Sequence, residues 1–505
     1  MPTALHTASP PAPHALDSDF VRDQLVARTV DLNGKTYNPD GEFVLYWMQS
    51  THRLDENWAL RAAIRTANRI KRPLVVHQGL DPTYLHASDR HHTFILQGAR
   101  DTARHADALG LHYHFVLRRR RDDDRRVVDR LAARAYVIIT DLFPTAGVRE
   151  RSERFAARVS CRTLAVDSVC TVPSGVFTKA EFAARTIRPK LAKLLDHSLE
   201  PVAEGAPIVP VSPALRRSIL DTLGVPPLPL ARMSDTDIAD AVAECEIDHE
   251  VPAVSLPGGS EAADSRLLHF TSAVLPDYAE RRNEAGDDDG TSRLSPYLHY
   301  GQVASAAVVR AARATGASPE SLDAFVQQVT TWRELAYNWC VRTRAFDRIE
   351  SLPDWVQRTM AAHVSDPRPH LYDLPALERG ETSDALWNTS QRQLLRTGVI
   401  HNYPRMIWGK TLLLWTPDYE SARRTMFYLN DKWALDGRDP NSVGGIMWCL
   451  GLWDRPWGNK AIWGGIRPMV TSRAKFKFDV KSYIANHGRQ ASMHELTASS
   501  RNTIV

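Results

Sequence analysis

The 505-residue chain lacks long apolar runs, paired cysteines and a marked excess of charge of either sign. No run approaches the roughly 18 apolar residues of a membrane-spanning helix, so no such span is expected. The five cysteines are scattered without a CxxC pair, which argues against a disulfide framework or a metal site and favours a reducing cytoplasm. With 63 basic and 59 acidic residues the formal net charge is +4, which permits a local nucleic-acid-binding patch without requiring one.

The first third of the chain alternates strand-like and helix-like stretches. Short apolar runs occupy residues 43–47, 74–77, 113–117, 136–140 and, more weakly, 163–167. Residues 57–70 and 94–109 carry apolar side chains at intervals of three and four, as amphipathic helices do. Strands that alternate with helices predict a doubly wound parallel sheet of Rossmann-like architecture. No GxGxxG fingerprint follows the first strand, so the usual dinucleotide phosphate signature is absent.

The rest of the chain is predicted to be mostly α-helical. Strand signals nearly vanish after about residue 265, while helical periodicity continues, for example in residues 322–343. Eleven of the 13 tryptophans lie between Trp332 and Trp463. This density fits either a helical core that uses large side chains or a domain that holds a planar aromatic cofactor or stacks bases.

These signals divide the chain into five segments. Residues 1–19, rich in proline, alanine and histidine, are expected to form a disordered leader, and residues 486–505 a flexible polar tail. The α/β domain is placed at residues 20–196 and the helical domain at residues 261–485. Residues 197–260 are rich in proline, alanine and acidic residues and are expected to form an inter-domain linker. We expect a monomer.

A polar segment around Thr291, Ser292 and Ser295 precedes a helix-like stretch. Hydroxyls and the Arg293 guanidinium ahead of a helix N-terminus can donate to phosphate oxygens. The same residue types also form ordinary helix caps, and the segment alone does not separate the two interpretations.

The chain resembles the photolyase/cryptochrome superfamily, and in its last third the class II DNA photolyases. The resemblance spans roughly residues 40–485 and rests on several long motifs. They are YWMQ (46–49), DENWAL (55–60), ARTIRPK (184–190), TSRLSPYL (291–298), WNTSQR (387–392), RMIWGK (405–410), YLND (428–431), LDGRDPN (435–441) and KFKFD (475–479).

The resemblance implies an α/β antenna domain followed by a helical FAD-binding domain. Class II members use light to repair cyclobutane pyrimidine dimers in DNA by electron transfer from reduced FAD. DNA that contains such dimers is then the expected partner, and the implied activity is that of a deoxyribodipyrimidine photo-lyase. An antenna chromophore, of the deazaflavin type or none, is left open.

The resemblance also assigns individual residues. The residues that would hold the flavin phosphates and ribityl chain are Tyr278, Arg282, Thr291, Ser292 and Ser295. Those placed beside the isoalloxazine ring are Arg405 and Asp436, as an ion pair, with Asn430 and Arg438 as further candidates. The residues that match the electron-transfer chain are Trp387, Trp408 and Trp415, and those that match the lesion pocket are Trp332, Met406 and Trp448. The spacing of Trp408 and Trp415, two helical turns or about 10 Å, by itself suits electron hopping.

One departure from the family pattern concerns the substrate. Photolyases carry a glutamate that hydrogen-bonds the dimer, and counting back four residues from Trp332 gives Gln328 here. An amide can bond a thymine carbonyl but is not a protonatable acid. Pro404, Ser442-Val443 and Trp453 also depart from the pattern. The alternative hypothesis is therefore a photolyase-like flavoprotein that has lost dimer repair and acts as a blue-light sensor or on another aromatic substrate.

Overall fold

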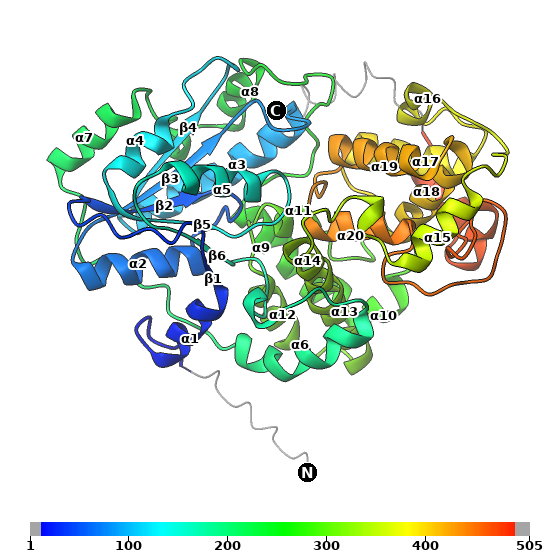
Figure 1. Ribbon diagram of the computed structural model, residues 1–505, viewed down its shortest axis with the longest axis horizontal. Helices are drawn as coiled ribbons and strands as arrows, with labels where there is room; N and C mark the ends of the chain where they lie inside the picture. Colours follow the sequence, from blue (N-terminus) through cyan, green and yellow to red (C-terminus); the bar gives the residue numbers. More distant parts are fainter. Residues whose placement is uncertain (1–11, 490–505) are drawn as a thin grey trace, which may run out of the picture.

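Six strands form one sheet in the N-terminal part of the computed structural model, which describes residues 12–489 (Figure 1). The strand order is β1-β6-β5-β2-β3-β4. The strands are β1 (Thr29–Asp31), β2 (Phe43–Met48), β3 (Leu74–Leu80), β4 (His112–Leu117), β5 (Ala135–Asp141) and β6 (Thr163–Val166). All neighbours pair in parallel except β1 and β6. From the central β2 the chain runs outward to β4 and then returns to β5 and β6, so the predicted doubly wound sheet is confirmed.

The predicted strands and helices of this part are present, and one strand was missed. The weak run at 163–167 is β6, and residues 57–70 and 94–109 correspond to α2 (Trp58–Ile70) and α3 (Asp89–Ala108). β1 was not anticipated because three residues are too short to carry a periodic signal. It pairs antiparallel with β6 at the edge of the sheet.

Helices cover both faces of the sheet, which explains why every residue of β2 is buried. On one face lie α1 (Asp19–Arg28) and α2, and on the other α4 (Val127–Ala133), α5 (Val148–Arg158) and α7 (Pro213–Leu223). Residues 197–260, placed as a linker, contain α7 and α8 (Asp235–Ala243), whose apolar side chains pack into the core. Most of the predicted leader and tail lies outside the described residues.

The C-terminal part is helical, as predicted. Its longer helices are α9 (Ser260–His269), α12 (Ser305–Arg313), α13 (Pro319–Gln327), α14 (Arg333–Arg342), α15 (Asp354–His363), α17 (Ala385–Thr397), α18 (Asn402–Trp415), α19 (Tyr419–Trp433), α20 (Pro440–Cys449) and α21 (Val480–His487). The shorter ones are α10 (Tyr278–Arg281), α11 (Ser295–His299) and α16 (Leu374–Arg379), and α6 (Ala184–Ser198) packs against this part from the N-terminal side. Within residues 12–489, no helix is long and apolar enough to cross a bilayer.

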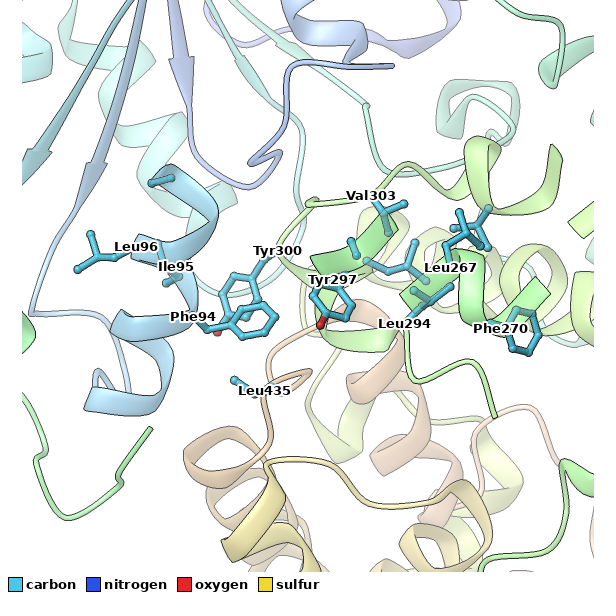
Figure 2. Packing of buried hydrophobic residues seen from close by; sticks show 14 of the residues in the cluster. Phe94, Ile95, Leu96, Leu267, Phe270, Leu294, Tyr297, Tyr300, Val303 and Leu435 are labelled. Carbon is cyan, nitrogen blue, oxygen red and sulfur yellow. The ribbon is translucent and has the colours of Figure 1, made fainter. Parts of the chain in front are cut away.

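The two parts share a hydrophobic core (Figure 2). Phe94 of α3 packs against Tyr297 and Tyr300, with ring centroids 5.5 and 5.2 Å apart. The fully buried Arg90, also on α3, donates to the carbonyl oxygens of Leu395 and Trp433 at the ends of α17 and α19, where the helix dipole favours a cation. The site-bearing helices are thus fixed to the sheet.

Candidate active site

A cavity of about 900 Å³ opens between α18, α20 and the loop that follows α20. α19 and a π-helical turn of residues 328–332, between α13 and α14, also line it. Eight of the residues assigned from the sequence line it: Arg282, Gln328, Trp332, Arg405, Met406, Trp408, Asn430 and Trp448. The predicted flavin, electron-transfer and substrate groups therefore meet at one cavity.

The expected ion pair is present in its wall. Arg405 Nη2 lies 2.9 Å from Asp436 Oδ1, and both side chains are mostly buried. Arg405 Nε is buried without a hydrogen-bond partner. Nearby on α19, the Asn430 amide donates to Asp431 and to Ser442 Oγ over 2.8 Å each. Because the pair uses only Nη2 and Arg405 lines the cavity, its guanidinium can still hold an anionic or carbonyl group there.

The other predicted phosphate contacts lie outside the lining of this cavity. Tyr278 is buried, and the Arg282 guanidinium lies 5.5 Å from the centre of its ring. The backbone carbonyls of Thr291 and Ser292 accept hydrogen bonds from Arg266. The hydroxyls of Thr291 and Ser295, by contrast, make no hydrogen bond to another described residue. The segment thus enters α11 with free hydroxyl donors.

Arg438 points away from the cavity. Its buried guanidinium donates to the Tyr300 hydroxyl over 3.1 Å and to the Leu85 carbonyl over 3.3 Å, and it lies above the Tyr84 ring. It therefore joins the helical part to the α/β part, where the sequence had suggested a contact with the flavin ring.

Three indoles form a chain that leads away from the cavity. The rings of Trp408 and Trp387 are stacked with centroids 6.1 Å apart, and Trp387 meets Trp415 edge to face at 5.4 Å. Trp408 lines the cavity and Trp387 is fully buried. Trp415 is the last of the three indoles, at the end of the series away from the cavity. The sequence spacing had connected Trp408 directly to Trp415, but Trp387 of α17 lies between them.

Comparison with known proteins identifies the family of the chain. A family model described as DNA photolyase matches residues 44–208. A deoxyribodipyrimidine photo-lyase of Methanothermobacter thermautotrophicus is 32% identical over 458 residues, 90% of this chain and 97% of that protein. One of Potorous tridactylus is 33% identical over 94% of this chain and 86% of that protein. The chain belongs to the DNA photolyase family. The expectation of an enzyme of the photolyase type is thereby confirmed.

Solved photolyase-like structures have the same fold at low sequence identity. A class III photolyase of Agrobacterium tumefaciens aligns with TM-score 0.62 and 15% identity over 89% of this chain and 87% of that one. A cryptochrome of Synechocystis sp. PCC6803 aligns with TM-score 0.63 and 14% identity over 88% of each chain. These similarities support the photolyase/cryptochrome fold.

In this photolyase-family protein, Gln328 is held by a cation. Its terminal amide lies against Arg282 Nη1 and Nη2, at 3.3 and 3.1 Å, and the atom that faces them is assigned as the oxygen. The reverse orientation would place the amide NH2 group against the guanidinium, so the contact fixes which way the amide faces. Its nitrogen is then the atom left to meet a ligand.

Two other departures, Pro404 and Trp453, lie where their immediate surroundings leave room for them. α18 begins at Asn402, so Pro404 sits in the first turn, where backbone N–H groups have no helical partner anyway. The Trp453 ring packs onto α20 at Gly444, where an added Cβ would lie 2.8 Å from the indole. The large indole is therefore matched by a glycine at the point of contact.

Sequence reasoning missed one buried group beside the cavity. Lys410 follows Trp408 on α18 and is completely buried, which lowers its pKa to about 8. Its Nζ lies 4.4 Å from the centre of the Trp448 ring. The signals in the sequence were its place at the end of the RMIWGK motif and the apolar run Leu412–Leu414 shortly after it.

Proposed function

We propose that this protein is a class II photolyase that uses light to repair cyclobutane pyrimidine dimers in DNA by electron transfer from reduced FAD. One observation carries the proposal. A single cavity joins the Trp408 end of the indole chain to a wall made of Trp332, Met406 and Trp448. Electron supply and substrate stacking then occur at one site.

FAD fits the chemistry of the groups present. Arg405 and Asn430 lie in the cavity wall, and the free hydroxyls of Thr291 and Ser295 suit the phosphates and ribityl chain. Tyr278, Arg282, Ser292 and Asp436 complete the proposed set. When bound, FAD supplies the electron that splits the dimer. The protein's part is to orient it and, through Trp387 and Trp415, to connect it to the exterior.

The substrate side suits a pyrimidine dimer turned out of the DNA helix. Trp332 is 38% exposed at the mouth of the cavity, so its face is available for stacking. At the rim, Arg455 and Arg467 lie 4.6 and 4.5 Å from the Trp457 ring centre. Arg473 and Lys477 add positive charge to the lining. Cations next to exposed indoles favour single-stranded or locally opened DNA.

We also propose a monomer that works in the cytoplasm. The five cysteines are free and buried, which agrees with a reducing compartment. An antenna chromophore of the deazaflavin type, or none, stays a prediction.

The test uses purified, FAD-loaded protein with its flavin photoreduced. Single-stranded DNA with one defined thymine dimer is added under blue light, and the recovery of thymine absorbance is followed. Rapid recovery is expected, and Trp332→Ala should slow it. Trp463→Ala, a matched change of an indole outside the cavity lining, should leave the yield per folded protein unchanged.

Gln328 motivates the alternative. If photoreduction succeeds while the dimers persist, the proposed repair activity is wrong. The protein would then be a photolyase-like flavoprotein that acts as a blue-light sensor or on another aromatic substrate.

A further inference from the structure

Lys410 places a positive charge directly behind one wall of the cavity. It is 0% exposed, and its Nζ lies 4.4 Å from the centre of the Trp448 ring. Trp448 in turn lines the cavity. Within residues 12–489, Nζ has no hydrogen-bond partner and no carboxylate within ion-pair distance. The Trp448 indole therefore lies next to both this ammonium and the cavity.

The charges around Lys410 act in opposite directions, with Asp454 attracting the ammonium and Arg467 repelling it. The titratable groups that face it are Cys449 on α20 and, from the following loop, Asp454 and Arg467. Asp454 Oδ1 accepts from Trp457 Nε1, while Oδ2 is buried without a partner. The positive charge of Arg467 repels the Lys410 ammonium and lowers its pKa. Burial raises the pKa of Cys449 to about 11, so this thiol stays neutral at physiological pH.

An unpaired buried ammonium is costly, and an apolar side chain of similar length would fill the same space. Buried charges of this kind next to a cleft are candidates for a functional role. The position of the Lys410 ammonium next to the Trp448 ring indicates what this functional role is. A cation on one face of an indole polarises the ring electrons toward itself, which leaves the opposite face more favourable to negative charge.

We propose that Lys410 makes the Trp448 wall selective for negative charge on whatever stacks against its cavity face. This inference rests on the proposed function, because a dimer that has accepted an electron is such a group. Lys410 transfers neither a proton nor an electron and acts only through its charge. A unit charge roughly 8 Å away in a partly buried site changes the rate of a charge-developing step by roughly thirtyfold at most.

The test compares wild type with Lys410→Met and Lys410→Arg, all loaded with FAD. At pH 7, Lys410→Met should lower the repair yield roughly tenfold, while Lys410→Arg retains most of it. The affinity for dimer-containing DNA, measured in the dark, should differ by no more than about twofold among the three proteins, because the unreduced dimer is neutral. The melting temperature of Lys410→Met should rise, because the variant removes an unpaired buried charge.

The pH profile separates this role from a merely structural one. The wild-type yield should fall as pH rises through about 8, where the Lys410 ammonium is lost, and the profile of Lys410→Met should be flat. Lys432→Met is the matched control, because Lys432 also lies over an indole, that of Trp433, but is paired with Glu378 away from the cavity. It should change neither the yield nor the pH profile.

Two outcomes overturn parts of this account separately. A Lys410→Met protein with the wild-type yield and pH profile contradicts the role of Lys410. A wild type that repairs nothing contradicts the proposed function instead. In that case the role of Lys410 is tested by comparing two affinities of each protein, one for orotate, an anionic pyrimidine, and one for its neutral methyl ester. Lys410→Met should reduce the preference for orotate severalfold, and an unchanged ratio would overturn the inference.

Discussion

The guanidinium of Arg282 holds the side-chain oxygen of Gln328 in the wall of the cavity, with Nη2 at 3.1 Å. The amide thereby becomes a donor of fixed orientation, and its charge does not change with pH. The position at which the family resemblance implies a glutamate is thus adapted to a neighbouring cation. The substitution does not simply remove a group.

We expect Gln328→Glu to impair repair. The new carboxylate would lie against Arg282, which should hold its pKa below the usual value of about 4.3. At pH 7 it would present negative charge where negative charge develops on the substrate, and the yield should fall roughly tenfold. The carboxyl band in infrared difference spectra measures the pKa, and dimer repair measures the yield.

Removing the cation is the control. In the double variant with Arg282→Met, the carboxyl pKa should rise and part of the lost yield should return, if the flavin content is maintained. A single Gln328→Glu variant that repairs better than wild type at pH 7 would contradict the prediction. It would mean that the position works best as a protonated acid despite Arg282.

Trp387→Phe should block photoreduction and leave dimer repair intact. Trp387 lies between Trp408 and Trp415, so its loss breaks the path at the middle. Photoreduction should slow by more than roughly tenfold, while FAD content and repair by chemically reduced protein stay unchanged. Trp463→Phe, in the same hydrophobic core, is the matched control. Normal photoreduction in Trp387→Phe would show that electrons take another route.

The sequence predicted elements that depend on local pattern and missed relationships that depend on packing. Buried β-strands such as β2 carry a dense apolar signal, and long amphipathic helices carry a periodic one. The place of Trp387 between two indoles of α18 depends on how α17 packs. The direction of Arg438 depends on contacts with Leu85 and Tyr300, far away in the sequence. Charge and residue type alone do not contain this information.

Arg405 and Arg438 are expected to differ in flavin binding, although the sequence placed both at the ring. Arg405→Met removes a charged donor from the cavity wall, which should weaken FAD binding roughly tenfold or more. Arg438→Met removes contacts to Tyr300 and Leu85 and should retain the flavin. The ratio of flavin to protein absorbance after desalting is the measurement, with melting temperature recorded for both. Selective flavin loss in a stable Arg438→Met protein would reverse this assignment.

Three histidines in the sheet predict a loss of stability in mild acid. The rings of His77 and His114 lie 4.9 Å apart, and His112 is next to His114 at 5.7 Å. Burial lowers the pKa of His77 to about 3 and of His112 to about 4, and it holds that of His114 well below its usual range. In the unfolded chain the three titrate near 6.5.

Because the folded protein keeps these rings neutral, their contribution to stability is complete above about pH 6.5. It is lost progressively as pH falls toward 4, since the unfolded chain then binds protons that the folded one excludes. Each histidine lowers the unfolding free energy by about 1.4 kcal/mol per pH unit in this window. Urea unfolding at pH 7.0 and 5.5 measures the effect. In His114→Leu, the slope of the unfolding free energy against pH should fall by the equivalent of about one proton taken up on unfolding. The exposed control His370→Gln should leave this slope unchanged. An unchanged pH dependence in His114→Leu would mean that this ring is protonated in the folded protein.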